Sequence, residues 1–343
     1  MKIGLVGYQG SGKSTLFEWL TGAVPDPSLA HSSQSAMAAV PDERVGPLCD
    51  IYQPKKITLA QLELVDTPGL DRKQDGNAAR LAQIREAGCL VVVVSAYNGS
   101  TDPVADLNSF DEDLLLADLE IVTGRIERLR ESIKKPRPDR DAQRAELEVL
   151  EPIAASLGEG QAIDLEVLSE EQLKATRSFQ LFTQKPRLVI LNAADDESDG
   201  ATLAAKVPGE VPCVAVPLRM ELELTQLEPV EREEFMREMG IKTADRDGLL
   251  RMLMEASHQS LFFTAGDKEV RTWLLRKGAT AVEAAGNIHT DMARGFIRAE
   301  TMRSEDLIRL GSEREMKAQN LVRQEPKDYI VQEGDVLLFK FNV

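Results

Sequence analysis

Short runs of apolar residues alternate along much of the chain with segments in which apolar residues recur at helical spacing. The apolar runs are typical of strands, and they lie at residues 3–7, 62–66, 90–95, 187–192 and 211–216. Helical patterns lie between them, for example over residues 77–87. The third run contains four valines in succession, at residues 91–94, which is typical of a strand buried on both faces of a parallel sheet. Strands that alternate with helices predict a doubly wound α/β domain with a mainly parallel sheet.

A different pattern interrupts this alternation. Apolar residues recur at helical spacing over 114–129, the pattern breaks at Pro136 and Pro138, and it resumes over 142–157. Two helical segments separated by prolines predict an antiparallel helical hairpin inserted into the α/β domain. The turn region of this hairpin is basic and contains Arg125, Arg128, Arg130, Lys134, Lys135, Arg137, Arg140 and Arg144. A solvated face with ion pairs and a surface for RNA phosphate are equally good interpretations of this charge.

The pattern changes again after about residue 260, where short strands and turns prevail. A closing strand is predicted over 336–341, after the turn signal EGD at residues 333–335. We therefore predict three parts: an α/β domain over 1–110 and 181–258, the hairpin over 111–180, and a small α+β domain over 259–343.

Composition narrows the class of protein. A net charge of −16 argues against a chain that coats nucleic acid with its whole surface, although it allows one local basic face. The three cysteines are far apart and form no C-x-x-C pair, which is typical of thiols in a reducing compartment. Met1 leads directly into the first strand, and the most apolar run is too short to cross a bilayer. We expect a cytoplasmic protein without a membrane partner.

The run GYQGSGKS at residues 7–14 has the spacing G-x-x-x-x-G-K-[ST], between a predicted strand and a predicted helix. In that context the glycines let backbone N–H groups surround phosphate oxygens, and the helix N-terminus adds partial positive charge. Lys13 is expected to reach the β- and γ-phosphates, and Ser14 to ligate Mg²⁺. The sequence therefore predicts a nucleoside triphosphate site that includes Gly7, Gly10, Ser11, Gly12, Lys13, Ser14 and Thr15.

A second motif, DTPG at residues 66–69, follows the second predicted strand. Asp66 is expected to hold Mg²⁺ through water, and the Gly69 N–H to contact the γ-phosphate. We therefore predict Ser14 and Asp66 as metal ligands, and Lys13, Asp66 and Gly69 as catalytic groups. The next residue is Leu70, where many GTPases have a glutamine that orients water. Because an apolar side chain cannot orient water, slow intrinsic hydrolysis is expected.

Base recognition is predicted at NAAD, residues 192–195, after a later strand. Asn192 and Asp195 match the guanine-reading pattern N-K-x-D, in which the aspartate accepts hydrogen bonds from guanine, but Ala193 replaces the lysine. A plain turn is the alternative, because Asn and Asp are common turn residues. The sequence leaves the choice between GTP and ATP open.

Together these residues resemble the YchF / Obg-like ATPase family of P-loop GTPases over almost the whole chain. The similarity lies in residues 7–17, 66–70 and 116–120, and it is densest at 263–271, 278–281, 285–291 and 295–300. The resemblance implies a GTPase-like domain, the inserted hairpin, and a C-terminal TGS domain of β-grasp shape. It also implies an NTPase stimulated by K⁺ or a partner, with an apolar residue at position 70. Ribosome or ribosomal RNA is the implied partner, in translation or stress responses, and the TGS domain offers a surface for protein.

The chain departs from the family pattern near the nucleotide. Asp195 replaces a family glutamate, and the P-loop interior is YQGS rather than LPNV. The first switch has no clear threonine, so Ser32 and Ser33 are candidate Mg²⁺ ligands, with His31 as a further candidate at the γ-phosphate. The second switch is shortened to DRKQDG at residues 71–76. Two alternative functions therefore stay open: a metabolic or stress ATPase, and a nucleotide-binding protein-interaction module with little or no hydrolysis.

Overall fold

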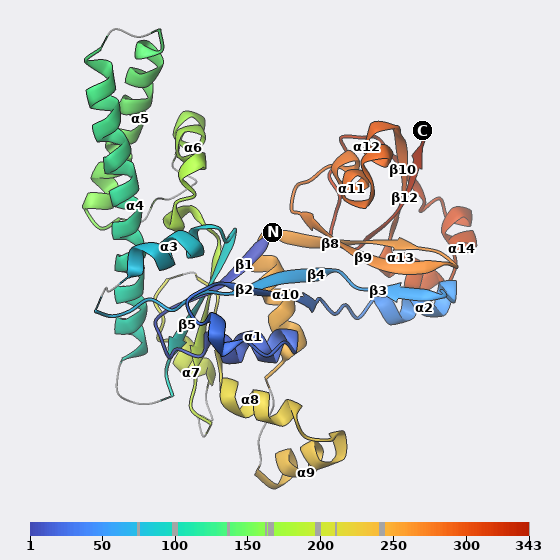
Figure 1. Ribbon diagram of the computed structural model, residues 1–343. Coiled ribbons are helices and arrows are strands. Elements are labelled where there is room, and N and C mark those ends of the chain that lie inside the picture. The colour runs from blue at the N-terminus through green and yellow to red at the C-terminus, as the bar shows by residue number, and fades with distance from the viewer. Residues whose placement is uncertain are drawn as a thin grey trace. The chain divides into compact units, whose positions relative to one another are not determined.

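The computed structural model describes residues 1–73, 76–97, 102–135, 138–161, 163, 168–195, 200–209, 211–239 and 244–342. Its contacts form two compact units (Figure 1). The first contains Met1–Ala36 and Glu63–Ala244, and the second contains Met37–Leu62 and Asp245–Val343. The predicted nucleotide motifs all lie in the first unit. Residues 37–62 group with the C-terminal residues, which no pattern in the sequence indicated.

A six-stranded sheet carries the first unit, with the strand order β2-β4-β1-β5-β6-β7. The strands are β1 (Lys2–Val6), β2 (Gln34–Ala39), β4 (Gln61–Asp66), β5 (Cys89–Ser95), β6 (Arg187–Asn192) and β7 (Cys213–Val216). The pairings from β4 through β7 are parallel, and every residue of β5 is buried. The predicted parallel α/β sheet is confirmed. Because parallel strands end at one edge, this topology brings together the segments that follow β1, β4 and β6.

Short helices connect these strands. They are α1 (Lys13–Thr21), η1 (Pro27–Leu29), α3 (Asn77–Arg85), α6 (Glu170–Thr176), η2 (Arg177–Phe179), η3 (Phe182–Gln184), α7 (Gly200–Ala204), α8 (Leu218–Thr225) and α9 (Pro229–Met239). Helix α1 buries Leu16, Phe17 and Leu20, which recur at helical spacing. It begins at Lys13, within the P-loop motif, so its N-terminus lies at the loop.

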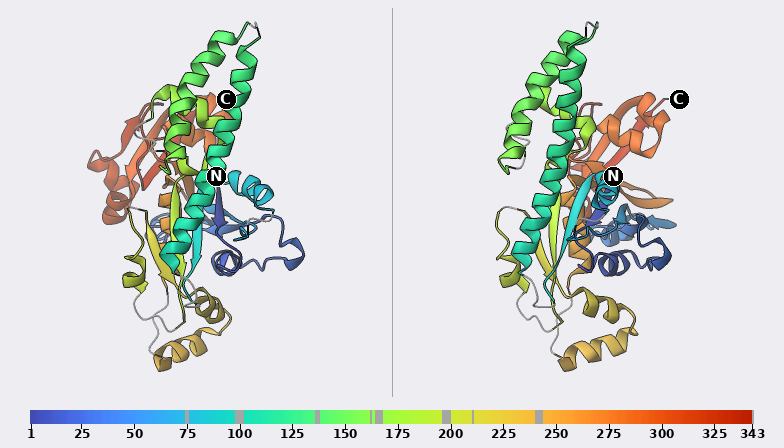
Figure 2. Two further views of the ribbon diagram at one scale, coloured as in Figure 1. Left: turned by 90° about the vertical axis from the view of Figure 1, so that its left-hand side faces the viewer. Right: turned by 60° about the vertical axis from the view of Figure 1, so that its left-hand side comes forward.

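Helices α4 (Pro103–Ile133) and α5 (Arg140–Gly158) form the predicted hairpin, and Figures 1 and 2 show them running side by side. Their contact is apolar and includes Val122, Ile126, Leu129, Leu150, Ile153 and Leu157. Helix α4 begins earlier than the hydrophobic pattern suggested, because Asp102 caps it at Pro103. Its first turns pack Leu107 and Phe110 in the same core as β5. One helix therefore belongs both to the sheet and to the hairpin.

The second unit has a six-stranded sheet of order β11-β10-β12-β8-β9-β3. Its strands are β3 (Lys56–Thr58), β8 (Gln259–Ala265), β9 (Glu269–Arg276), β10 (Phe296–Arg303), β11 (Arg323–Glu325) and β12 (Asp335–Phe341). Strands β8 and β12 are parallel, each flanked by an antiparallel partner, which is the predicted β-grasp order. Its helices are α2 (Val45–Tyr52), α10 (Arg246–Ala256), α11 (Ala281–Ile288), α12 (Thr290–Arg294), α13 (Ser304–Leu310) and α14 (Glu313–Ala318).

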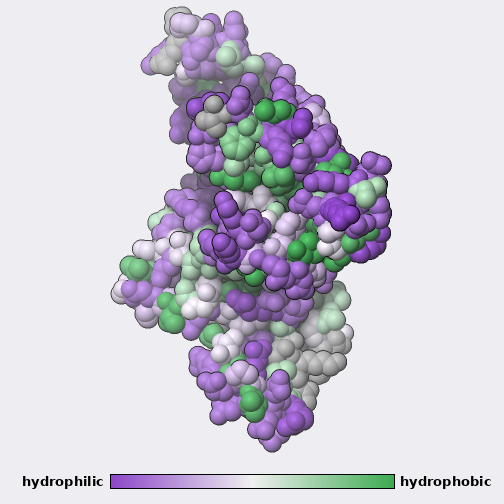
Figure 3. Space-filling model, turned by 90° about the vertical axis from the view of Figure 1, so that its right-hand side faces the viewer, coloured by the Kyte–Doolittle hydropathy of each residue, from purple (hydrophilic) through white to green (hydrophobic). Residues whose placement is uncertain are grey.

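Hydrophilic residues prevail on the face of the molecule drawn in Figure 3, where apolar residues occur in small groups. Over the described residues, none of the helices combines the length and the apolar content that a membrane span requires.

Candidate nucleotide-binding site

The P-loop joins β1 to α1 in a conformation that needs glycine. Gly10 and Gly12 have φ angles of 76° and 105°, in the left-handed region where other residues are strained. A Cβ added to Gly12 would also collide with the side-chain amide of Asn192. Gly12 is the N-cap of α1, so the positive end of the helix dipole lies at the loop. This is the strand–loop–helix arrangement that a phosphate cradle requires.

Lys13 is buried, and its Nζ donates to the carbonyl oxygen of Tyr8 at 2.8 Å. Burial lowers the pKa of Lys13 to about 8, although the nearby carboxylate of Asp66 acts in the opposite direction. A Cβ added to Gly69 would lie 2.7 Å from Lys13 Nζ, so the DTPG loop passes directly beside the lysine. Gly69 and the Lys13 ammonium are therefore direct neighbours in the site.

Ser14 and Asp66 form the pair that the sequence proposed for a metal. The Ser14 hydroxyl donates to Asp66 Oδ2 at 2.6 Å. The other oxygen, Asp66 Oδ1, is buried and has no hydrogen-bond donor among the described residues. Burial raises the pKa of Asp66, while Ser14 and Lys13 oppose that shift. A hydroxyl beside a carboxylate with a free buried oxygen is a donor set that fits Mg²⁺.

A cleft opens on the phosphate side of these residues. It is lined by Lys13, Ser14, Asp66 and Gly69, by His31, Ser32 and Gln34 from the first switch, and by Arg80 of α3. Ser33 is not part of this lining, and its N–H and hydroxyl both donate to Gln83 Oε1 of α3 at 3.0 Å. Of the two candidate serines, the cleft therefore includes Ser32.

Leu70 is fully buried in the core that contains β5. Its backbone is bonded to the P-loop on both sides: Gln9 N–H donates to Leu70 O, and Leu70 N–H donates to Gly7 O, both at 3.0 Å. The side chain at this position cannot contact a water in the cleft. Any group that assists hydrolysis must come from another residue.

A second pocket shares Gly10, Lys13 and Ser14 with this cleft and includes the residues that are expected to read the base. Its lining comprises Gly10, Gly12, Lys13, Ser14, Thr15, Tyr97, Asn192, Ala193, Ala194, Asp195 and Arg219. Asn192 Nδ2 donates to Ser11 O at 3.1 Å, and its Oδ1 accepts from Leu218 N at 3.3 Å. Both amide atoms of Asn192 therefore bond to protein backbone, whereas the Asp195 carboxylate has no hydrogen bond to the described residues.

Three residues at the site carry no motif and were missed by sequence reasoning: Arg80, Tyr97 and Arg219. The Tyr97 hydroxyl donates to Gly10 O at 3.0 Å, directly at the P-loop. Tyr97 follows β5, so its position just beyond the end of a central parallel strand was the available signal. Arg80 and Arg219 lie within helices that carry no distinguishing pattern.

The basic residues at the hairpin tip are partly neutralised. Arg125 makes two bonds to Glu146, of 2.8 and 2.7 Å, Arg130 pairs with Glu151, and Lys134 pairs with Glu131. Three cations stay exposed and without an ion pair to the described residues: Arg128, Lys135 and Arg144. Arg137 lies outside the described residues. The ion-pair interpretation therefore holds for Arg125, Arg130 and Lys134, and a surface for RNA phosphate stays a prediction for the three exposed cations.

Comparison with known proteins identifies close relatives. A family model described as "50S ribosome-binding GTPase" matches residues 2–123, and the model YchF-GTPase_C, "Protein of unknown function (DUF933)", matches residues 260–342. The chain is 34% identical to "Ribosome-binding ATPase YchF" of Bacillus subtilis (strain 168), over 99% of both chains. It is 34% identical to "Obg-like ATPase 1" of Oryza sativa subsp. japonica, over 100% of this chain and 92% of that one. The solved YchF GTPase of Schizosaccharomyces pombe superposes with a TM-score of 0.84 at 27% identity, over 99% of this chain and 97% of that one.

Proposed function

The chain belongs to the YchF family, and on that basis we propose that it binds GTP or ATP with Mg²⁺, hydrolyses it slowly, and acts as a nucleotide switch on the ribosome. The observation that carries the proposal is the convergence of Lys13, Ser14, Asp66 and Gly69 on one cleft. Relatives across the full chain carry the names of ribosome-binding ATPases, which supports the ribosomal part.

The P-loop residues have distinct roles in this proposal. Lys13 and the backbone N–H groups around it would hold the β- and γ-phosphates, and the Gly69 N–H would contact the γ-phosphate. Ser14 and Asp66 would hold Mg²⁺, which supplies positive charge to the phosphate oxygens when bound. The orphaned oxygen of Asp66 supports this assignment.

We assign Arg80 the place of a second catalytic cation. Among the described residues that line the phosphate-side cleft, the lysine and arginine side chains are those of Lys13 and Arg80. The guanidinium of Arg80 has, among the described residues, one hydrogen bond, from Nη1 to Asn77 Oδ1 at 3.2 Å, and no ion pair with a carboxylate. An arginine can stabilise the charge that develops on the transferred phosphoryl group. This role compensates for the buried Leu70.

Base choice is assigned to Asp195. A carboxylate accepts two hydrogen bonds from the edge of guanine, which adenine cannot donate. The guanidinium of Arg219 lies close enough to Asp195 for the two charges to interact. Parallel titration with fluorescent GTP and ATP analogues tests this point, and tighter binding of ATP would refute it.

Ribosome contact is assigned to the exposed cations of the hairpin tip, Arg128, Lys135 and Arg144. Three phosphate contacts predict binding that weakens steeply with salt. A ribosomal partner would support a cytoplasmic location. A protein partner at the second unit is supported by exposed apolar side chains on neighbouring strands, at Ile297 and Leu338.

The proposal is tested by single-turnover hydrolysis of GTP and ATP, with K⁺ or Na⁺ and with or without ribosomes. Hydrolysis above the uncatalysed rate, stimulated by K⁺ or ribosomes, is the expected result. Tight nucleotide binding without any turnover would instead favour the protein-interaction module. Cosedimentation with ribosomes that does not depend on the nucleotide state would refute the switch.

A further inference from the structure

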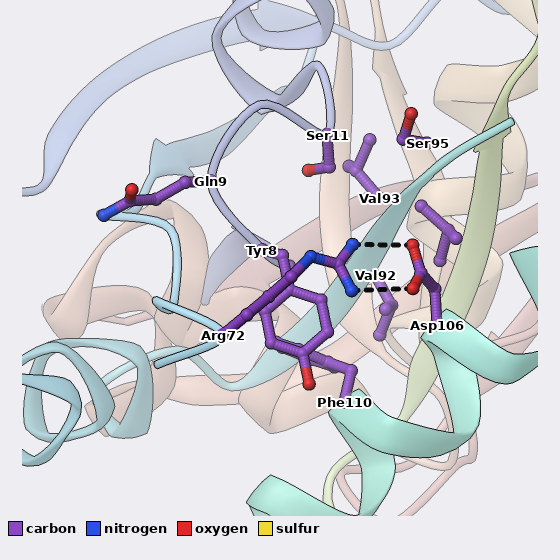
Figure 4. Close-up of a pocket in the computed structure, with 11 residues that line it drawn as sticks. Tyr8, Gln9, Ser11, Arg72, Val92, Val93, Ser95, Asp106 and Phe110 are labelled. Carbon is purple, nitrogen blue, oxygen red and sulfur yellow. Dashed lines mark hydrogen bonds and ion pairs between the residues drawn. The ribbon is translucent and has the colours of Figure 1, made fainter. Parts of the chain in front are cut away.

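Arg72, two residues beyond Leu70, connects three segments beside the phosphate site (Figure 4). Its guanidinium pairs with the carboxylate of Asp106 on α4 through two hydrogen bonds of 2.7 Å. It also lies over the ring of Tyr8 in the P-loop, 4.5 Å from the ring centroid. The Tyr8 hydroxyl donates to Asp113 Oδ2, farther along α4, at 2.9 Å. We call the contact of Arg72 with Tyr8 and Asp106 the Arg72 clamp.

The two sides of the clamp differ in exposure. The Asp106 side chain is 9% exposed, whereas the Arg72 side chain is 49% exposed. Arg72 can therefore move into water at little cost, but Asp106 would then be a buried carboxylate without its cation. This asymmetry favours the closed clamp and lets it open from the side of the second switch.

The clamp is continuous with the residues that face the nucleotide. Leu70 is hydrogen-bonded to the P-loop through both its N–H and its carbonyl oxygen, and Gly69 lies beside Lys13 Nζ. The segment from Gly69 to Arg72 is therefore held by the P-loop at one end and by α4 at the other. A displacement of Gly69 would strain or release the bond between Arg72 and Asp106.

The clamp also reaches the hairpin. Helix α4 runs without interruption from Pro103 to Ile133, about 46 Å at the rise of an α-helix. Its first turns contain Asp106 and Phe110, whose ring meets Tyr8 edge to face at 5.5 Å. Its far half forms one arm of the hairpin. A displacement of Asp106 therefore displaces the first turns of a continuous helix whose far half belongs to the hairpin.

We propose that Arg72 and Asp106 are positioning residues that couple the γ-phosphate contact at Gly69 to the orientation of the helical hairpin. The inference rests on the proposed function, because it requires the cleft to bind a nucleoside triphosphate. Coupling is reciprocal, so the clamp should favour triphosphate over diphosphate and should make ribosome binding depend on the nucleotide.

The test compares the full chain with Arg72→Gln, Asp106→Asn and the double variant. Fluorescent non-hydrolysable triphosphate and diphosphate analogues are titrated into each protein, and the ratio of the two affinities is measured. We expect each single variant to lower the preference for triphosphate about five- to tenfold, and the double variant to lower it no further. Arg72→Lys should restore part of the preference, since it keeps the charge but not the bidentate geometry.

Arg187→Gln is the matched control. It breaks another ion pair of α4, between Arg187 and Asp111 at 2.6 Å, and Arg187 begins β6 at the end opposite to Asn192. Thermal unfolding of every variant separates lost coupling from lost stability. Cosedimentation should depend on the nucleotide in the wild type and in Arg187→Gln, but not in Arg72→Gln.

Each outcome bears on the proposal. An unchanged affinity ratio in the clamp variants, or an equal change in Arg187→Gln, would overturn the clamp and leave the proposed function standing. A wild-type chain that binds no nucleotide would overturn the proposed function, and the clamp with it.

Discussion

The substitution Asn192→Ala distinguishes two roles that this residue could have: to hold the P-loop in place, or to read the base. In Asn192→Ala the carbonyl oxygen of Ser11 and the N–H of Leu218 both lose their side-chain partner, and Asn192 itself is buried. Because these bonds are 3.1 and 3.3 Å long, they are ordinary neutral hydrogen bonds rather than short, strong ones. Their combined loss should weaken nucleotide binding by about 1–2 kcal/mol, which is roughly five- to thirtyfold in Kd.

The loss should be the same for GTP and ATP, because the bonds of Asn192 hold the P-loop and not the base. Fluorescence titration with analogues of both nucleotides measures it. Asp195→Asn is the comparison, since that change should weaken the guanine nucleotide selectively. If Asn192→Ala weakens one nucleotide at least tenfold more than the other, the positioning role is refuted and Asn192 contacts the base.

Three further predictions follow from burial and charge. Burial lowers the pKa of Lys13 to about 8, so in the nucleotide-free protein the Lys13 ammonium loses its proton as the pH rises through 8. Triphosphate affinity should therefore fall about tenfold per pH unit above pH 8, which titrations from pH 7 to pH 10 would measure. Arg80→Ala should lower kcat ten- to a hundredfold and change KM little, with binding of the diphosphate–aluminium fluoride complex as the second readout; an equal loss in KM would contradict a transition-state role. Asp118 is fully buried and accepts bonds from Arg85, Phe182 and Thr183, so Asp118→Ala should lower the unfolding free energy by about 3–5 kcal/mol in denaturant titrations; a loss below about 1 kcal/mol would show that the site relaxes.

Contiguous motifs were the part of the site that the sequence could reveal. The P-loop is a local object: its glycines, its lysine and the helix that follows lie within a few residues, and the chemistry dictates their spacing. The parallel order of the sheet was also predictable, because short apolar runs alternate with helical spacing along the chain. Asp66 and Ser14 could be paired across 52 residues, since strand ends meet at one edge of such a sheet.

Other features depend on contacts that leave no periodic trace. The sequence predicted that the apolar Leu70 cannot orient a water molecule, and the structure buries it fully. Nothing in the sequence showed that Arg72 of the second switch would pair with Asp106. Residues 37–62 join the second unit through the three-residue strand β3, through the ion pair of Arg44 with Glu333, and through α2, which packs Leu48 into a core with Phe263 and Met316. The strand and the ion pair are weak signals in a sequence, because charged residues are common on every surface, and the apolar face of α2 does not show which core it joins.

Helix α4 explains why the coupling residues lie where they do. A hairpin attached to the sheet by flexible loops could not transmit a small shift, because the loops would absorb it. Here the same helix packs Leu107 and Phe110 into the sheet core and, beyond them, forms the hairpin arm with Val122 and Ile126. The base of the helix is therefore a place where a switch loop can act on the whole arm. Asp106 is the carboxylate buried at that base, and Arg72 is the cation that the second switch brings to it.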